Sequence, residues 1–534
     1  MNTPPIPYQH LLPTALMALL LSGCGGSGSG DEPPPPVQYP DFTDVVNLGG
    51  DTTVPDASNS GHGFSTPAPN LSQPELARHL AGDAHFETSF TTAPNSQHPE
   101  LDGLGPVFNN SNCNACHQRD GRSSTLINAD GQYRVLGTAA GIFARISLKR
   151  DHDCSEQNAS NDYCAPIPVP DFGTQMFHRG VLKARPDWQQ HNFIGQADIA
   201  MAWQRSDFTY PDGSVTELLK PDFRFSNAYD SPDDISASSL GQANVVAGLR
   251  NGMPVFGLGL LELIPEAAIL ALADENDDNN DGISGRPNRV FDAVKAANGD
   301  SLPLSLGRFG WKASTPSVRQ QSLGALRGDI GITNSLFPQE SVAGTALHHD
   351  YLARTHYQDS GSDEQGLPES SQAFDDEVVF YAETLGVPAR RDVAHSDVRE
   401  GARLFAAVNC SGCHTPSFTT ASSGNLGGVA APAGLLNQTI YPFTDMLLHD
   451  MGPELADGRS DFVANGNEWK TRPLWGIGLT QTVNPAACFL HDGRACTVEE
   501  AILWHGGEAQ TSRDAFSQLS AAERRQLLAF VRSL

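Results

Sequence analysis

Basic residues are scarce in this sequence, and long apolar segments are absent. Among 534 residues there are 34 Lys and Arg against 62 Asp and Glu, which gives a formal net charge of −28. This balance argues against nucleic-acid binding, because a phosphate backbone is bound through Lys and Arg. Only 39% of the residues are apolar, which excludes a polytopic membrane protein. The acidic surface has two interpretations: it attracts a small basic electron carrier, or it keeps the protein soluble.

An apolar run near the N-terminus, from Leu11 to Leu21, is too short to remain as a membrane-spanning helix. It ends in Leu-Ser-Gly-Cys, which is similar to the lipobox of bacterial lipoproteins, where the cysteine, here Cys24, is lipidated and becomes the new N-terminus. No Lys or Arg precedes the run, so an ordinary secretory signal is the alternative. Gly25 rather than Asp follows the cysteine, which favours a lipid anchor in the outer membrane and a periplasmic location.

The nine cysteines contain two C-x-x-C-H motifs. The motifs are Cys113, Cys116 and His117, and Cys410, Cys413 and His414. Two thiols at this spacing add to the two vinyl groups of a haem, and the adjacent histidine is placed as an iron ligand. A thioredoxin-like pair and half a zinc site are the alternatives, but neither requires two copies that are each followed by His. The sequence therefore predicts two covalent c-type haems with proximal ligands His117 and His414.

Four further cysteines form two close pairs, Cys154 with Cys164 and Cys488 with Cys496. In an oxidising compartment these pairs predict two small disulfide loops. Free thiols are the alternative, but the even number that is left after haem and lipid attachment favours disulfides.

Each haem motif follows a glycine and a phenylalanine, a pattern typical of the entry helix of cytochromes c. Gly105 and Phe108 precede the first motif, and Gly401 and Phe405 precede the second. The second pair predicts a helix that starts near residue 396 or 397. Between the motifs lies a long region rich in Pro, Gly and Asp.

Three other segments have helical patterns. Short helical stretches are expected over 265–273 and 371–385 within the region between the motifs. Apolar residues at helical spacing over 520–534 predict a helix that closes the second haem domain.

From about residue 70 to its end the chain resembles a family. The stretches that carry the resemblance begin at Gly103 (GLGPVFNNSNCNACHQRDGR), Val255 (VFGLGLLELIPE), Gly307 (GRFGWKA), Leu447 (LLHDMGPELADG) and Phe489 (FLHDGRACTVEEAILWHGGEA). They are similar to dihaem c-type oxidoreductases labelled peroxidases or "thiol oxidoreductase-like" proteins, and more distantly to bacterial dihaem cytochrome c peroxidases. The thiols give no support to the second label, because haem attachment and disulfides account for them.

The expected fold is mainly α, with two cytochrome c-like haem domains and a long loop-rich insertion. We expect a lipoprotein signal over 1–24 and a flexible Gly/Ser/Pro tether over 25–60. The N-terminal haem domain with its insertion covers 61–390, and the C-terminal haem domain covers 391–534.

The function that the resemblance implies is reduction of hydrogen peroxide, or another small oxidant, with electrons from a small redox protein. It also implies that the C-terminal haem receives electrons and that the N-terminal haem is peroxidatic. An electron-transfer dihaem lipoprotein without peroxidase activity is the alternative. An oxidase that modifies a protein or a metal-ion substrate is a third possibility.

The resemblance requires one six-coordinate iron and one iron with an open position. Met451 is the first candidate for the sixth ligand at the haem of His414, although core packing explains a methionine equally simply. Met446 and His449 compete with it. Three histidines are candidate distal ligands of the first haem: His98, His178 and His191.

Glu262 lies in the apolar segment GLGLLELIP and is our candidate for the catalytic acid/base group. A surface glutamate before Pro265 is the alternative. Trp311 is the candidate electron relay between the haems, with a core tryptophan as the alternative. Its neighbours Arg308 and Lys312 could pair with haem propionates.

A separate segment fits the start of a calcium loop. Its residues are Asp277, Asn279, Asp281, Gly282 and Ile283, of which Ile283 would give a backbone carbonyl. The twelfth position of the loop is Asn288, so the usual bidentate Glu is missing. A bound Ca²⁺ and an acidic surface loop both remain open.

Overall fold

The computed structural model describes residues 41–55, 60–93, 95–128, 130–137, 141–150, 154, 163–180, 195–346, 349 and 366–534. The signal over 1–24 with Cys24, the tether up to residue 40, and His191 lie outside the described residues. Only 29% of the structure is helical and 19% is strand, so the expectation of a mainly α fold is wrong. The fold is mixed and loop-rich, because the region between the two motifs forms short helices and small sheets.

Among the described residues the helices are α1 (Gln73–Glu87), α2 (Leu258–Glu262), α3 (Glu266–Leu270), α4 (Ala293–Ala297), α5 (Val318–Ala325), α7 (Gln372–Thr384), α8 (Ser396–Ala407), α9 (Thr480–Val483), α10 (Val498–Leu503), α11 (Gln510–Gln518) and α12 (Ala521–Ser533). The strands are β1 (Thr53–Val54), β2 (Val107–Phe108), β3 (Arg134–Val135), β4 (Ile142–Leu148), β5 (Arg179–Gly180), β6 (Asp198–Thr209), β7 (Val215–Ser226), β8 (Val245–Asn251), β9 (Arg289–Phe291), β10 (Leu304–Leu306), β11 (Val387–Pro388), β12 (Phe418–Thr419), β13 (Asn425–Leu426), β14 (Val429–Ala430), β15 (Thr439–Ile440), β16 (Leu448–Asp450) and β17 (Glu468–Lys470).

Two pairs of long helices, α1 with α7 and α8 with α12, repeat one packing arrangement. In the second pair a Cβ atom on Gly401 would lie 2.0 Å from the Gln526 carbonyl oxygen, so the helices cross at this glycine. Phe405, one helical turn further on, packs against Phe530 of α12 with ring centroids 5.1 Å apart. The expected helices near residue 396 and over 520–534 are therefore present and packed against each other.

The first pair, α1 with α7, packs in the same way. Its glycine and aromatic residue are not Gly105 and Phe108, the residues expected from the sequence. A Cβ atom on Gly82 would lie 2.1 Å from the Glu377 carbonyl oxygen, and the ring of Phe86 lies 5.3 Å from that of Tyr381. The helix that packs beside the first C-x-x-C-H motif is thus α1. The segment Gly105–Phe108 is not helical, because its last two residues form β2 and pair with β5.

Capping residues explain where these helices begin. A capping box of Ser72 and Glu75 starts α1, and one of Ser520 and Glu523 starts α12. The hydroxyl of Ser371 caps α7 by accepting from the Phe374 backbone N–H.

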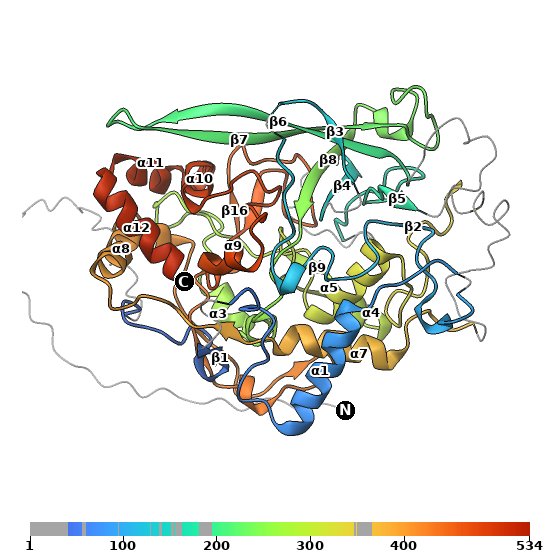
Figure 1. Ribbon diagram of the computed structural model, residues 1–534, viewed down its shortest axis with the longest axis horizontal. Helices are drawn as coiled ribbons and strands as arrows, with labels where there is room; N and C mark the ends of the chain where they lie inside the picture. The colour runs from blue at the N-terminus through green and yellow to red at the C-terminus, as the bar shows by residue number, and fades with distance from the viewer. Residues whose placement is uncertain are drawn as a thin grey trace, which may run out of the picture. The chain divides into compact units, whose positions relative to one another are not determined.

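The sheets have two or three strands each, and the longest pairing is the antiparallel hairpin β6–β7. This hairpin extends over the side of the molecule that carries α10 and α11 (Figure 1). Near its turn the Tyr210 hydroxyl donates to Glu499 at 2.8 Å, and Arg524 donates to Asp212 at 2.7 Å. A part of the insertion is thereby fastened to the C-terminal helices.

Residues 38–534 cluster as one unit, and one hydrophobic core contains residues of both helix pairs. The segment 41–55 belongs to this unit, although the tether was expected to reach residue 60. Leu48 is fully buried, and β1 pairs with β11. Among the described residues no helix is both long and apolar enough to span a membrane.

Candidate functional site

The first C-x-x-C-H motif follows β2 and faces helix α1. The His117 Nδ1–H donates to the Met253 carbonyl oxygen at 2.5 Å, and the ring of Phe86 lies 6.2 Å from the imidazole. Neither motif cysteine is in a disulfide. Burial raises the pKa of the Cys113 thiol to about 12 and that of Cys116 to about 11.

The second motif repeats this geometry. The His414 Nδ1–H donates to the Phe443 carbonyl oxygen at 2.9 Å, and the ring of Phe405 lies 6.4 Å from the imidazole. Burial raises the pKa of Cys410 to about 12 and lowers the pKa of His414 to about 4.

These features fit haem attachment in two ways. A carbonyl can only accept, so both histidines carry their proton on Nδ1 and present an unprotonated Nε2, the form that ligates iron. Burial that disfavours thiolates also disfavours thiolate metal or redox chemistry, whereas a neutral thioether is compatible with an apolar wall.

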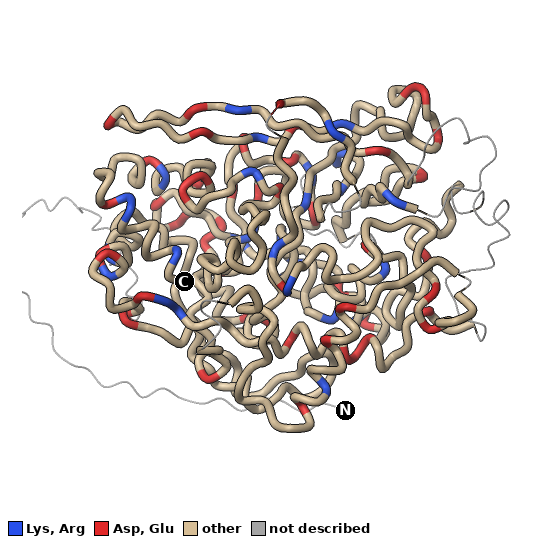
Figure 2. Tube along the Cα trace, viewed as in Figure 1, with Lys and Arg blue, Asp and Glu red and all other residues tan. Residues whose placement is uncertain are grey.

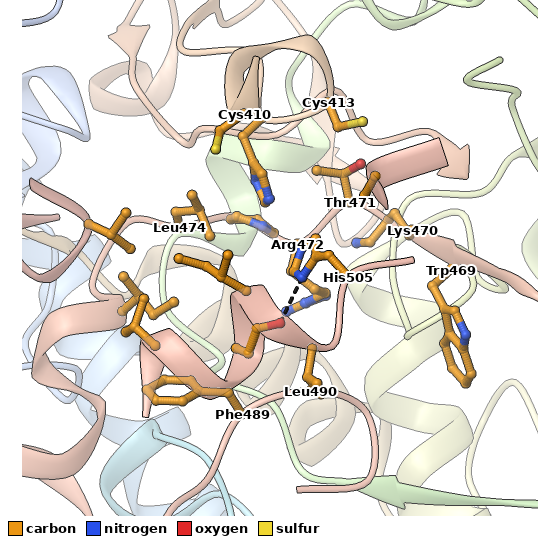
Figure 3. Close-up of a pocket in the computed structure, with 18 of the residues that line it drawn as sticks. Cys410, Cys413, Trp469, Lys470, Thr471, Arg472, Leu474, Phe489, Leu490 and His505 are labelled. Carbon is orange, nitrogen blue, oxygen red and sulfur yellow. Dashed lines mark hydrogen bonds between the residues drawn. The ribbon is translucent and has the colours of Figure 1, made fainter. Parts of the chain in front are cut away.

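A cavity of about 240 Å³ lies beside the second motif, and apolar and aromatic side chains form most of its wall (Figure 3). The residues of this wall include Arg122, Trp311, Cys410, Cys413, His414, Met451, Lys470, Arg472 and His505. A flat, largely apolar prosthetic group attached to Cys410 and Cys413 would lie in this cavity.

Three cations in this wall have no carboxylate partner among the described ion pairs. Arg122 donates to the backbone oxygens of Cys488 and Leu490 at 2.8 and 2.5 Å, and Lys470 donates to a backbone oxygen at 2.6 Å. Arg472 has no hydrogen bond among the described residues and lies in the pocket of Figure 3. Burial lowers the pKa of Arg472 to about 10. Carboxylates of a bound group, such as haem propionates, would complement these charges.

Arg308 and Lys312, the propionate partners suggested by the sequence, are otherwise engaged. Arg308 donates to two backbone oxygens of the α2 region. Lys312 is fully buried and is held by Asp457 at 3.0 Å and by two further backbone oxygens. Neither side chain lines the cavity beside the second motif, so the propionate role of these two residues stays a prediction.

The candidate sixth ligands at the second motif differ in their hydrogen bonds and in whether they line the cavity. His449 donates from one ring nitrogen to Asp445 and from the other to Glu508, at 2.7 and 2.8 Å. Burial lowers its pKa, but the contacts with the Asp445 carboxylate and with Cys413 together outweigh this and hold the pKa well above the ordinary value. Both ring nitrogens of His449, which also lines the cavity, are thus occupied by carboxylates in this structure. Met446 is buried in the core and does not line the cavity, whereas Met451 does.

His505 also lines the cavity, and the sequence reasoning missed it. Its Nδ1–H donates to the Ala501 carbonyl oxygen at 2.7 Å, so its Nε2 is unprotonated like those of His117 and His414. The distance in sequence between Cys410 and His505 does not indicate a shared site. His505 does lie in the resembling stretch that begins at Phe489, which could have pointed to it.

The histidines proposed for the far side of the first haem differ in exposure. His98 has a side chain that is 61% exposed and contacts Glu100 at 3.2 Å, so it does not line a buried site. His178 is buried, and neither of its ring nitrogens has a partner among the described residues.

Trp311 lies between the two motifs. Its indole Nε1 donates to the Asn251 carbonyl oxygen at 3.0 Å, two residues before the Met253 carbonyl that holds His117. Its ring lies 5.2 Å from the guanidinium of Arg122 and 5.3 Å from that of Arg472. The same ring lines the cavity beside the second motif.

Glu262 ends α2, and its carboxylate accepts from the Val318 backbone N–H at 2.6 Å at the start of α5. Burial raises its pKa to about 7. No described hydrogen bond or ion pair joins it to a residue of either C-x-x-C-H motif. Its observed role is to cap α5, which leaves the acid/base role as a prediction.

The calcium-like loop follows α3 and has a strand rather than a helix on its other side. Asp277 accepts from the Gly282 N–H at 3.1 Å, Asn279 from the Asp281 N–H at 2.8 Å, and Asp281 from the Ile283 N–H at 2.8 Å. These side chains are thus used within the loop. The described His, Cys, Asp and Glu side chains contain one cluster with metal-ligand spacing, Cys413, Asp445 and His449, which belongs to the second motif.

Two disulfides join the cysteines outside the motifs, Cys154 to Cys164 and Cys488 to Cys496. These are the two pairings expected from their close spacing. The second loop carries Arg122's acceptor, the Cys488 carbonyl, and so helps to fix a cavity cation.

A family model described as "Di-haem oxidoreductase, putative peroxidase" matches residues 42–534. The match includes both C-x-x-C-H motifs, both helix pairs and the insertion. No curated protein matches the sequence.

Proposed function

We propose that this chain, which belongs to the di-haem oxidoreductase family, reduces hydrogen peroxide with electrons from a small redox protein. The observation that best supports this proposal is that the two motifs have the same surroundings. At each motif a backbone carbonyl orients the histidine, and two helices that cross at a glycine pack beside it. Trp311 lies between the two sites. Two haem sites with an aromatic side chain between them would suit a reaction that needs two electrons.

Each haem would be held by its motif. Cys113 and Cys116, and Cys410 and Cys413, would form the thioethers, and His117 and His414 would ligate iron through Nε2. When bound, the two haems would supply the stored electrons and the iron that meets peroxide. Arg122, Lys470 and Arg472 would neutralise propionates, since no described carboxylate pairs with them.

The second site would be the electron-entry site. His505 and Met451 both line its cavity, and we favour His505 as sixth ligand because its tautomer is fixed with Nε2 available. His414 and His505 together would then hold the second iron, which would leave peroxide to the first site.

Trp311 would relay electrons between the sites. Its ring lies 5.2 Å from the guanidinium of Arg122 and 5.3 Å from that of Arg472, and its indole nitrogen donates to the strand end that leads to Met253. Acidic residues occur along the whole trace (Figure 2), so charge alone does not locate the docking surface of the donor.

The protein would act in the periplasm, anchored through Cys24 to the outer membrane. A calcium ion at the loop of Asp277, Asn279, Asp281 and Ile283 remains a separate prediction. Because those oxygens now accept from their own loop, binding would require these side chains to turn towards the ion.

Spectroscopy and turnover test this function together. The mature protein, produced with haem-attachment machinery, should contain two covalent haems by pyridine haemochrome assay. After one-electron reduction, one haem should be high-spin and react with peroxide, while a reduced small cytochrome is consumed at two equivalents per peroxide. Two permanently low-spin haems would support the electron-transfer alternative and overturn the peroxidase.

A further inference from the structure

A cluster of buried polar side chains lies beside Cys116, away from the cavity of the second motif. Antiparallel pairing of β2 with β5 sets Phe108 opposite Arg179 and so brings the two strand ends together. The members of the cluster are Asn109, Asn110, Gln175, His178 and Arg179, which are all at most 9% exposed.

The cluster is joined to the first motif by hydrogen bonds. Arg179 Nη1 donates to Asn110 Oδ1 at 3.2 Å, and Asn110 Nδ2 donates to the Cys116 sulfur at 3.2 Å. The His178 backbone N–H donates to Asn109 Oδ1 at 3.4 Å. The histidine and the arginine therefore lie where a haem attached to Cys116 would begin.

Several polar atoms of the cluster have no partner among the described residues. They are Nδ2 of Asn109, Oε1 of Gln175, both ring nitrogens of His178, and Nε and Nη2 of Arg179. Leaving buried donors and acceptors unpaired is unfavourable, and more so for a charged group. Such a concentration in one place indicates a site that is completed by a polar ligand.

Local charges favour a ligand that accepts hydrogen bonds. No described carboxylate pairs with Arg179, and the nearby Asp329 is engaged by Gln175 Nε2 at 2.6 Å. Asp329 lies in the π-helical turn Leu326–Ile330, and its carbonyl accepts from the Asn109 and Asn110 N–H groups. Such turns are frequent at functional sites. Haem propionates are not the expected ligand here, because they lie on the edge of the ring opposite the thioethers.

We propose that His178 and Arg179 form the oxidant site of the first haem, with His178 as the proton carrier and Arg179 as the electrostatic stabiliser. This inference rests on the proposed function, which it deepens by naming the groups that act on peroxide. It moves the acid/base role from Glu262, whose carboxylate caps α5.

In this step the O–O bond of hydrogen peroxide breaks. His178 accepts a proton from one peroxide oxygen and returns it to the departing oxygen, whose negative charge Arg179 stabilises. Two electrons from the donor protein reduce the two oxygens, and two protons from solvent complete two molecules of water.

The test uses the haem-loaded full chain with His178→Gln and Arg179→Lys. Matched controls are His62→Gln and Arg134→Lys, which change an exposed histidine and an exposed arginine. Glu262→Gln is the comparison variant. Two rates are measured: the reaction of the half-reduced protein with peroxide, and the binding of hydrogen cyanide to the first haem by absorption. Cyanide binding also requires a base to take a proton, so it reports the site without turnover.

We expect His178→Gln to slow both reactions about a hundredfold, and Arg179→Lys to slow peroxide reduction less, because the charge remains. Both controls should keep both rates, and Glu262→Gln should slow them less than His178→Gln does. Unchanged rates in His178→Gln, or a hundredfold loss confined to Glu262→Gln, would overturn the proposal. A low-spin to high-spin change in His178→Gln would make His178 an iron ligand and also overturn it.

The two proposals fail in different ways. If the wild type ignores peroxide but its cyanide binding depends on His178, the peroxidase function fails and the polar site stands. If the wild type reduces peroxide and neither variant changes any rate, the function stands and this site fails. Haem content is measured first, and Arg179→Lys supplies the result if His178→Gln loses haem.

Discussion

Each motif histidine is fixed by a single hydrogen bond from Nδ1 to a backbone carbonyl, Met253 for His117 and Phe443 for His414. That bond selects the tautomer and orients the ring, so the ligand nitrogen is already in position when no metal is bound.

The motif itself predicts the cysteines and histidines, since its chemistry needs fixed spacing. It does not predict the carbonyls, because these come from loops distant in sequence. Arg122 and Arg472 were missed for the same reason.

At the residue scale, His505→Ala should convert the second haem from low-spin to high-spin, because the nitrogen that we assign as sixth ligand is removed. Absorption and electron paramagnetic resonance spectra of the oxidised protein measure this change, and added imidazole should restore the low-spin form. Met451→Leu is the matched control in the same cavity and should leave the spectra unchanged. The opposite pattern would return the assignment to Met451.

Burial of His79 predicts a loss of stability in acid. Its side chain bonds to the Thr384 hydroxyl at 2.8 Å, and burial lowers its pKa from 6.5 to about 4. The unfolded chain therefore takes up a proton near pH 6.5, whereas the folded protein resists until about pH 4. The associated stability is complete above pH 6.5 and falls by up to about 3 kcal/mol as the pH drops through 4.

His79→Gln removes this titration and keeps a polar partner for Thr384. Calorimetric melting between pH 7 and 4.5 should show a smaller decrease in melting temperature for the variant than for the wild type. Equal decreases would assign the acid sensitivity to other groups.

At the element scale, the two helix pairs are built on one pattern, a glycine at the crossing and an aromatic residue one turn later. The second pair was predictable, because α8 directly precedes its motif and α12 ends the chain. For the first pair, Gly82 and Phe86 have the same spacing as Gly401 and Phe405. They were overlooked because Gly105 and Phe108 lie closer to the cysteines and because α7 follows about 290 residues after α1. Short-range pattern reasoning does not reveal a helix pair closed around an insertion.

Gly82→Ala should destabilise the protein by about 2–3 kcal/mol. The added Cβ would meet the Glu377 backbone oxygen at 2.1 Å, and backbone cannot move aside cheaply. Because α1 backs the first motif, haem content should fall first at that site. Thermal unfolding and haem stoichiometry measure both effects. Gly324→Ala is the control in helix α5, where the nearest atom is 3.7 Å away, and should be neutral or slightly stabilising. Equal melting temperatures for the two variants would contradict this packing argument.

At the scale of the whole molecule, the sequence predicted two haem sites but not their enclosure. Residues of both helix pairs share one hydrophobic core, and the hairpin β6–β7 reaches from the insertion to α10 and α12. The two-residue strands were not predicted, because they carry no alternating pattern long enough to read, whereas the longer strands β4, β6, β7 and β8 were overlooked. The mixed fold has a physical reason. Short helices and strands pack the loops between the motifs against one another, and without them this region would have no core.

The proposed connection between the two sites runs through Trp311, whose indole donates to the Asn251 carbonyl and whose ring lies 5.2 Å from Arg122 and 5.3 Å from Arg472. Trp311→Leu should slow electron transfer from the second haem to the first about tenfold, equivalent to about 1.4 kcal/mol on the barrier. Stopped-flow absorption, after rapid reduction of the second haem by the donor, measures this rate. Trp203→Leu is the matched control, because Trp203 is equally buried and donates to a carbonyl at 3.0 Å in a different core. If both variants slow transfer alike, general loosening rather than a relay explains the loss, whereas a defect confined to Trp311→Leu, with both haems retained, identifies the ring as the route.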